Sequence, residues 1–267
     1  LTEDEIIDHL QNVDGLLAGL EPLNNRVFTS CPELKAIARV GIGMENVELD
    51  AATKAGIKVS NTPKGPTDAV AEMTLAAALS LSRSILPAND ALHQKNWEKS
   101  ISMGLNNSRL LIIGYGRIGR RVAELFQAMG SHIMVCDPAV SENELQSSLK
   151  LVELYDGLAK ADIITLHLSE DRPILKAAEF DVMQNNVIIL NSARGNLINE
   201  DALIEALDNN RVASAWLDVF PKEPYSGKLT KYKQVLLTPH ISTYTVQCRK
   251  DMEMAAVNNL LRDLAFN

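Results

Sequence analysis

The sequence predicts an α/β protein in which a doubly wound parallel sheet is inserted into a smaller α/β unit. From Leu110 onward, short apolar runs alternate with helix-patterned segments, which is typical of parallel strands that are buried on both faces. A glycine-rich turn follows the first of these runs, and the flanking segments have a different pattern. The 267 residues, 46% of them hydrophobic, are enough for two cores.

The first 65 residues have the pattern of the smaller unit. Three short apolar runs and one short helix are expected there: strands at Gly15–Ala18, Ala36–Val40 and Ile57–Ser60, and a helix at Asp50–Gly56. Gly56 is expected to close that helix.

A long helix is expected next. Thr67 or Asp68 can cap its start, and Pro87 is expected to stop or kink it near Leu86. Alanine and leucine occupy more than one of its faces, which indicates burial against another subunit or domain.

The sheet is predicted from six apolar runs, each rich in isoleucine, valine or leucine. The runs are Leu110–Ile113, His132–Cys136, Asp162–Leu166, Val187–Leu190, Val212–Leu217 and Val235–Leu237. Helices fit between most of them, at Arg117–Met129, Leu151–Lys160, Ala177–Gln184 and Asp201–Asn209. Six parallel strands with right-handed crossovers make a doubly wound sheet of the Rossmann type.

A last helix, Val246–Leu264, can return to the smaller unit. The expected organisation is therefore a Rossmann domain at residues 66–242, inserted into a smaller domain that consists of residues 1–65 and 243–267.

Composition excludes several classes of function. The formal charge is −8 and no Lys/Arg-rich run is present, which argues against nucleic-acid binding. Cys31, Cys136 and Cys248 are far apart and lack CxxC spacing, so neither a disulfide framework nor a metal site is indicated, and a reducing, cytoplasmic compartment is expected. No export signal and no membrane span are expected.

The glycine-rich turn has the pattern GxGxxG at residues 114–119. The pattern is weak alone, but here it follows a strand and opens a helix. Gly114, Gly116 and Gly119 then lie where a tight turn, close approach of a pyrophosphate, and helix–strand packing each disfavour a Cβ. Backbone N–H groups of Arg117 and Ile118, at the start of the helix, can meet the phosphates.

An acidic residue ends the second strand. Asp137 follows Gly119 by 18 positions, where a carboxylate can accept hydrogen bonds from the adenosine ribose hydroxyls. Pro138, and not an arginine, comes next, and a carboxylate would repel a 2′-phosphate. The sequence therefore predicts NAD rather than NADP; the alternative is a structural turn beside a surface aspartate.

Polar residues also follow the later strands, where ligands of open α/β sheets bind. They are His167, Asn191, Ser192, Arg194, Asp218 and His240. We expect His167, Ser192, Ala193 and Asp218 to line the cofactor crevice.

Three of the candidates also have a structural explanation. Arg194 could pair with a surface carboxylate, but Gly195 suggests a turn that aims it inward, and a guanidinium binds both oxygens of a substrate carboxylate. His240 could be an ordinary loop histidine, although its place behind Pro239 at a strand end favours acid/base chemistry. Glu223 could be a solvated loop charge; its merit is that such a histidine needs a carboxylate partner.

Four motifs in this order resemble the D-isomer-specific 2-hydroxyacid dehydrogenase family. They are GYGRIG at 114–119, NSARG at 191–195, LDVFPKEP at 217–224 and LTPHIS at 237–242. Segments 41–49, 59–63 and 69–72 resemble family signatures too, so the resemblance spans nearly the whole chain.

The resemblance implies an NAD-binding Rossmann domain, a flavodoxin-like substrate domain and a homodimer. It implies that Arg194 holds the carboxylate and carbonyl of the substrate, that His240 is the acid/base at the C2 oxygen, and that Glu223 pairs with His240. It also places Asp218 against the nicotinamide carboxamide and the loop Gly41–Gly43 against the substrate, which makes Arg39, Ile42 and Gly43 candidate substrate-binding residues.

The substrate stays open between 3-phosphoglycerate and hydroxypyruvate or glyoxylate. Arg39 resembles the pattern of phosphoglycerate dehydrogenases, but Ala18-Gly19 stand where those enzymes carry a second phosphate-side arginine. The first strand, helix and second strand of the family would precede Leu1, Glu45 replaces the usual Asp, and residues 168–173 lack the usual Pro-Leu-Thr.

Two alternatives remain at this stage. Some relatives of the family sense NAD(H) as corepressors or interaction proteins without turnover, and formate oxidation uses a related scaffold. The presence of Arg194, Glu223 and His240 together favours a dehydrogenase.

Overall fold

The computed structural model describes residues 1–170 and 172–265. The chain forms two compact units. Unit 1 consists of Leu1–Pro66 with Thr243–Asn267, and unit 2 of Thr67–Ser242.

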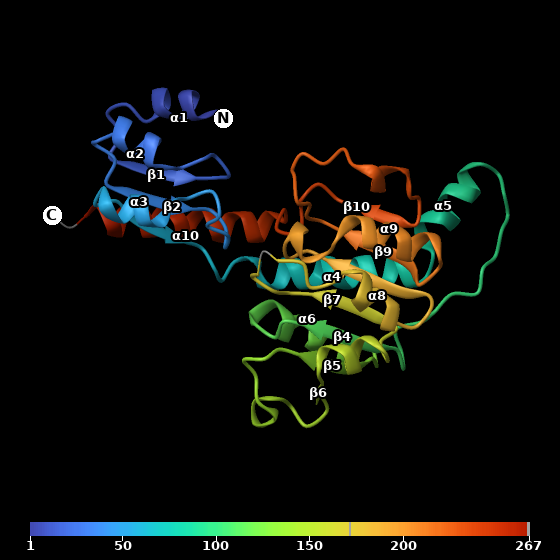
Figure 1. Ribbon diagram of the computed structural model, residues 1–267. Coiled ribbons are helices and arrows are strands. Elements are labelled where there is room, and N and C mark those ends of the chain that lie inside the picture. The colour runs from blue at the N-terminus through green and yellow to red at the C-terminus, as the bar shows by residue number, and fades with distance from the viewer. Residues whose placement is uncertain (171, 266–267) are drawn as a thin grey trace. The chain divides into compact units, whose positions relative to one another are not determined.

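Unit 1 is a small parallel sheet covered by helices. Its strands lie in the order β1-β2-β3, at Gly15–Ala18, Ala36–Arg39 and Lys58–Asn61. Its helices are α1 (Glu3–His9), α2 (Asn25–Ser30), α3 (Leu49–Lys54) and α10 (Val246–Leu264). Helix α10, red in Figure 1, packs against all three strands, so the end of the chain completes the unit that its beginning opens.

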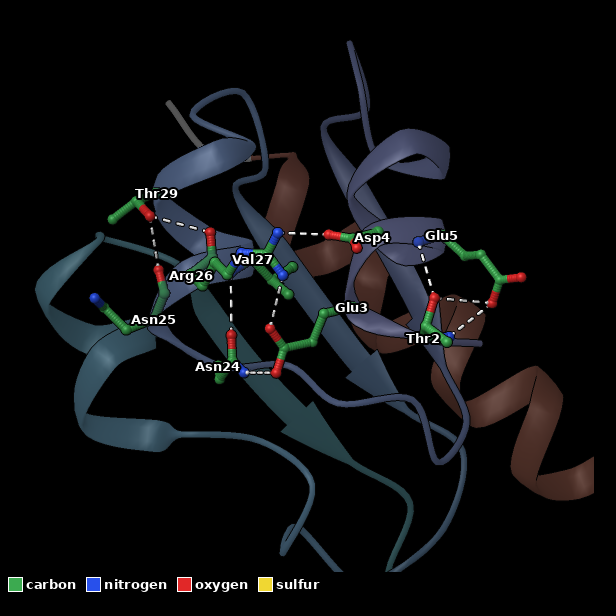
Figure 2. A network of polar contacts seen from close by, with 9 residues as sticks. All are labelled: Thr2, Glu3, Asp4, Glu5, Asn24, Asn25, Arg26, Val27 and Thr29. Atoms are coloured by element: carbon green, nitrogen blue, oxygen red, sulfur yellow. Dashed lines mark hydrogen bonds and ion pairs between the residues drawn. The ribbon is translucent and has the colours of Figure 1, made fainter.

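A polar network joins the first two helices of unit 1 (Figure 2). Arg26 forms ion pairs with Glu3 and Asp4, and the side-chain amide of Asn24 donates to Glu3 at 2.7 Å. Asn24 also caps α2, because its side-chain oxygen accepts from the backbone N–H of Val27. Exposed ion pairs contribute little individually, so this network fixes the place of α1 on α2 more than it stabilises the unit.

Unit 2 is a doubly wound sheet of seven parallel strands in the order β10-β9-β8-β7-β4-β5-β6. The strands are β4 (Arg109–Ile113), β5 (His132–Cys136), β6 (Lys150–Leu151), β7 (Ile163–Leu166), β8 (Val187–Asn191), β9 (Val212–Leu217) and β10 (Val235–Leu237). The order reverses between β4 and β7, which is the point where such sheets bind their ligands. The predicted fold class is confirmed, but the prediction of six strands missed β6, because two edge residues leave no apolar run.

Helices cover both faces of this sheet (Figure 1). They are α4 (Pro66–Ser82), α6 (Arg117–Ala128), α7 (Leu154–Leu158), α8 (Ala177–Val182) and α9 (Glu200–Asp208). Unit 2 also contains α5 (Ile85–His93) and the 3-10 turns η1 (Glu142–Glu144), η2 (Gly195–Leu197) and η3 (Lys228–Lys231). Side chains of β4 alternate between two cores: Leu110 and Ile112 belong to one, and Leu111 and Ile113 to the other. This alternation explains why the buried strands read as continuous apolar runs.

The long helix expected up to Leu86 is in fact two helices. It begins at Pro66, before either expected cap, and ends at Ser82; Ser84 has a left-handed backbone with φ of 51°. Pro87 does not stop a helix, because it lies in the first turn of α5, where a missing N–H costs nothing. None of the α5 side chains is buried.

Two further differences are local. The helix expected at Leu151–Lys160 is the shorter α7, since Leu151 belongs to β6. Helices α1 and α2 were not expected at all.

Among residues 1–170 and 172–265, no single helix is long and apolar enough to cross a membrane. Helices α4 and α5 reach that length and composition only together, with a bend of 59° between them.

Candidate active site

The glycine-rich turn joins β4 to α6 at the reversal of the strand order. Gly114 has φ of 94°, and a Cβ there would lie 2.6 Å from the carbonyl oxygen of His167. A Cβ on Gly119 would lie 2.2 Å from the oxygen of Gly114. A Cβ on Gly116 would meet no atom within 4 Å, so the start of α6 is open above this residue. Packing within the protein therefore requires glycine at 114 and 119. The space beside Gly116 is not filled by protein atoms and is left open to a bound molecule.

Asp137 is held against this turn. One carboxylate oxygen accepts the backbone N–H of Tyr115 at 2.7 Å, and the other accepts the backbone N–H of Ala139 at 2.9 Å. Each oxygen keeps a further lone pair for a ligand hydroxyl.

The turn and the neighbouring strand ends fit a dinucleotide. The N-terminus of α6 carries no side-chain cap, so its backbone N–H groups can bind phosphate. Within the part of the chain that the structure describes, the buried hydroxyl of Ser192, after β8, has no hydrogen-bond partner. A buried hydroxyl without a partner costs free energy, and a ligand group would satisfy it.

His167 follows β7 and is kept neutral. Its Nε2 lies 2.9 Å from the hydroxyl of Thr165, and desolvation of the ring lowers the pKa of His167 to about 3. A histidine that does not protonate near neutral pH is better suited to line the cofactor crevice than to act as an acid or base.

His240 and Glu223 form a pair after the last two strands of the sheet. Nδ1 of His240 lies 2.9 Å from Oε2 of Glu223, while Oε1 of Glu223 accepts the backbone N–H of Phe220 at 3.0 Å. The His240 side chain is 47% exposed, and its backbone is left-handed with φ of 53°. The pair thus presents an imidazole to solvent with a carboxylate fixed behind it.

Asp218, at the end of β9, is fully buried and holds the loop that carries His240. Its Oδ1 accepts the hydroxyl of Thr238 at 2.6 Å and the N–H of Ile241 at 2.9 Å. Its Oδ2 accepts the N–H and the hydroxyl of Ser242 at 2.9 and 2.5 Å. A carboxylate has about four acceptor positions, so an additional nicotinamide contact would have to share one that is already used.

Arg194 lies in a tight turn after β8. The side-chain amide of Asn191 donates to the carbonyl of Arg194 at 2.9 Å, and Nη1 of Arg194 donates to the carbonyl of Ala193 at 2.7 Å. A Cβ on Gly195 would lie 2.0 Å from the backbone of Phe220. This close approach brings the Arg194 turn beside the segment that leads to Glu223.

In unit 1, the loop Gly41–Gly43 is fixed by the end of β3. The hydroxyl of Thr62 accepts the N–H of Gly41 at 2.8 Å, and the side-chain amide of Asn61 donates to the carbonyl of Ile42 at 2.8 Å. The guanidinium of Arg39 donates to the carbonyl of Val40 and fills the space beside Gly41. The loop is therefore rigid on its β3 side.

The sequence pattern placed most candidates at strand ends, and in unit 2 the structure joins His240 to Glu223 and Asp137 to the glycine turn. The sequence pattern did not reveal that Thr238, Ser242 and Asp218 anchor the His240 loop, although Thr238 is itself a polar residue at a strand end.

Of the irregular segment at 168–173, residue 171 lies outside the described residues. Across the described parts of the chain, no group of three His, Cys, Asp or Glu could hold a metal ion.

A Rossmann sheet with a glycine turn at its switch point defines a dinucleotide-binding unit, and the His240–Glu223 pair lies on the same edge of the sheet. A sequence model of the D-isomer specific 2-hydroxyacid dehydrogenase, NAD binding domain, matches residues 75–242. The chain belongs to the D-isomer specific 2-hydroxyacid dehydrogenase family, and NAD is the cofactor of unit 2.

Curated relatives carry several dehydrogenase and reductase names. The chain is 33% identical to a hydroxypyruvate reductase of Thermotoga maritima, over 100% of this chain and 90% of the relative, and 34% identical to a D-3-phosphoglycerate dehydrogenase of Synechocystis, over 93% of this chain and 46% of the relative. The chain thus spans about half the length of the phosphoglycerate dehydrogenases that it matches.

Solved structures agree with this assignment. A glyoxylate reductase from Paecilomyes thermophila aligns with a TM-score of 0.89 and 29% identity, over 99% of this chain and 86% of that one. The TT0316 protein from Thermus thermophilus aligns with a TM-score of 0.93 and 29% identity, over 99% of this chain and 87% of that one.

Proposed function

We propose that this protein interconverts a D-2-hydroxy acid and its 2-keto acid with NAD(H). The observation that carries the proposal is the His240–Glu223 pair, 2.9 Å apart, on the same sheet edge as the NAD-binding turn. Bound NAD would accept a hydride from C2 of the hydroxy acid, and NADH would return one to the keto acid.

His240 is the proposed acid/base. An ionised Glu223 only accepts hydrogen bonds, so Nδ1 of His240 carries the proton that is shared with it. Nε2 is then left to take the hydroxyl proton in oxidation and, once protonated, to return it in reduction. Glu223 holds the ring in this tautomer and stabilises the imidazolium that forms.

Arg194 is the proposed holder of the substrate carboxylate. Its guanidinium can bind both carboxylate oxygens and keep C2 in a fixed orientation. The side-chain amide of Asn191 donates to the carbonyl of Arg194 and fixes the turn, and Nη1 of the guanidinium donates to the carbonyl of Ala193.

The proposed cofactor contacts lie on the same edge of unit 2. They are Gly114, Gly116, Arg117, Ile118, Gly119, Asp137, His167, Ser192 and Ala193, with Asp218 as a further candidate. We propose a preference for NAD over NADP, because Asp137 is pinned by two backbone N–H groups and cannot turn away from a 2′-phosphate.

Arg39, Ile42 and Gly43 are the proposed substrate-binding residues of unit 1. The relatives named hydroxypyruvate reductase, glyoxylate reductase and D-3-phosphoglycerate dehydrogenase define the candidate substrates. If Arg39 recognises a phosphate, Arg39→Met should raise KM for 3-phosphohydroxypyruvate and leave KM for glyoxylate unchanged; equal effects on both would reject that role.

We also propose a cytoplasmic homodimer. Segment 85–101 forms an arm that stands away from the rest of unit 2 (Figure 1) and exposes apolar side chains: Ile85, Leu86, Leu92, Trp97 and Ile101. A second copy would cover them. A monomeric mass in sedimentation at micromolar concentration would reject the dimer.

The proposed cytoplasmic location rests on the three free thiols. Burial raises the pKa values of all three, and such thiols suit a reducing compartment.

The experiment that tests the proposed chemistry is His240→Ala. Turnover should be lost while NADH binding stays nearly unchanged, because His240 touches the reacting atoms and not the glycine turn. The matched control is His132→Ala, an exposed histidine at the start of β5, which should keep both. Loss of turnover and NADH binding together would point to a structural role for His240.

A further inference from the structure

We infer that Thr238 is a positioning residue, whose hydroxyl fixes His240 in place by joining Asp218 to the core. The inference rests on the acid/base role proposed for His240. Thr238 lies two residues before His240, and its hydroxyl forms hydrogen bonds with Trp216 and Asp218.

The first step of the argument is how Asp218 holds the loop. All four hydrogen bonds that its carboxylate accepts come from residues 238–242: one from Thr238, before His240, and three from Ile241 and Ser242, after it. Because Asp218 is fully buried at the end of β9, the loop is fastened to the sheet on both sides of His240.

The second step is the direction of the Thr238 bonds. The indole N–H of Trp216 donates to the Thr238 hydroxyl oxygen at 2.9 Å. An indole N–H only donates and an ionised carboxylate only accepts, so the single hydroxyl proton of Thr238 must point to Asp218. Trp216 is itself fully buried in the core of unit 2. The relay therefore runs in one direction, from Trp216 through Thr238 to Asp218.

The third step is that His240 depends on this backbone. Its φ of 53° is a left-handed conformation that a residue other than glycine keeps only when its surroundings hold it. The N–H of His240 donates to the carbonyl of Thr238 at 3.0 Å, and the N–H of Thr238 donates to Leu217 at 3.1 Å. Since 47% of the His240 side chain is exposed, the backbone, more than ring packing, decides where the imidazole lies.

Valine at position 238 tests the relay, because it keeps the shape of threonine and removes the hydroxyl. Thr238→Val leaves the Trp216 N–H without its acceptor and removes one bond from Asp218. We expect kcat to fall roughly 10- to 100-fold, as for a small misplacement of a catalytic group, with the Kd for NADH within about twofold of wild type. Thr238→Ser, which keeps the hydroxyl, should restore kcat to within about threefold.

Thr74→Val is the matched control. Thr74 is a fully buried threonine of α4 whose hydroxyl donates to the carbonyl of Val70 at 2.8 Å. This variant also loses one buried hydroxyl, and we expect its kcat to stay at the wild-type value.

The measurements are kcat, KM, the Kd for NADH and the NMR signal of the His240 ring, assigned by its loss in His240→Ala. An unchanged kcat in Thr238→Val, or a failure of Thr238→Ser to restore it, would overturn the inference. If the wild type reduces no keto acid, the proposed function fails, and the NMR signal decides alone. A His240 signal that shifts in Thr238→Val and returns in Thr238→Ser supports the positioning role, and an unmoved signal overturns it.

Discussion

Replacing Asp218 by asparagine changes a single atom of a buried side chain, yet it turns an acceptor into a donor. In one orientation the new amide group faces the Thr238 hydroxyl and the N–H of Ile241; in the other it faces the N–H and the hydroxyl of Ser242. A hydroxyl can rotate, but the Thr238 oxygen already accepts from Trp216, and a backbone N–H cannot turn away. At least one backbone N–H beside the buried side chain of residue 218, that of Ile241 or of Ser242, therefore loses its acceptor in either orientation.

The expected cost follows from these bonds. An unsatisfied buried donor costs about 1–3 kcal/mol, and the remaining bonds weaken as the acceptor loses its charge. Together these effects should lower the free energy of unfolding of unit 2 by about 3 kcal/mol.

The assay uses the position of the two tryptophans. Trp97 is 79% exposed and Trp216 is buried beside the Asp218 network, so in a Trp97→Phe background the fluorescence reports on the surroundings of Trp216 alone. Urea unfolding of Asp218→Asn is compared there with Asp137→Asn, a half-buried carboxylate with two backbone donors, which should lose about 1 kcal/mol. If Asp218→Asn loses no more than Asp137→Asn, the anchoring account is wrong.

Three further outcomes are expected. Asp137→Ala should weaken NAD binding and reduce the preference over NADP, and an unchanged ratio of the two Kd values would refute the role of Asp137. Gly116→Ala should keep the Tm of the protein but weaken NADH binding at least about tenfold, since a methyl group there meets no protein atom within 4 Å and occupies the phosphate approach, so an unchanged Kd would refute it. His167 has a folded pKa of about 3 against an ordinary value of 6.5, so its stabilising effect is complete above pH 6.5 and is lost as the pH falls toward 3. Between about pH 7 and about pH 5 this group should lower the free energy of unfolding by about 2 kcal/mol, and His167→Gln, measured by urea unfolding, should remove that part of the pH dependence; an equal pH dependence in both proteins would contradict the neutral buried state.

The strands of unit 2 were predictable because a strand that is buried on both faces consists almost entirely of apolar residues. The runs at His132–Cys136, Val212–Leu217 and Val235–Leu237 coincide with β5, β9 and β10. The edge strand β6 was not predictable in this way, since Lys150–Leu151 has one charged and one apolar residue and pairs on one side only.

The helices were harder to place where proline or a short length decides. Pro87 suggests a stop, but the first turn of α5 tolerates it, and the break lies instead at Ser84, whose left-handed backbone no local pattern reveals. The start of helix α1 could have been predicted, because Thr2 and Glu5 form a capping box, a sequence pattern typical of helix N-termini.

The sequence predicted which residues belong to the candidate site, but not how these residues are arranged. Parallel strands place their ends on one edge, so His240, Arg194 and Asp137 could be named from strand ends alone. His240 and Glu223 are 17 positions apart in the sequence, and their pairing depends on the neighbouring strands β9 and β10, which a local pattern does not show. The same holds for the bonds of Asp218, which join side chains 20 to 24 residues apart.

The central claim is tested most directly by the absorbance of NADH during incubation with glyoxylate, hydroxypyruvate, pyruvate, 2-ketoglutarate and 3-phosphohydroxypyruvate, each with wild type and with His240→Ala. The account predicts NADH oxidation with at least one keto acid by the wild type and none by the variant, at equal NADH binding. Bound NADH that no keto acid oxidises would contradict the claim and identify a protein that binds the cofactor without turning it over.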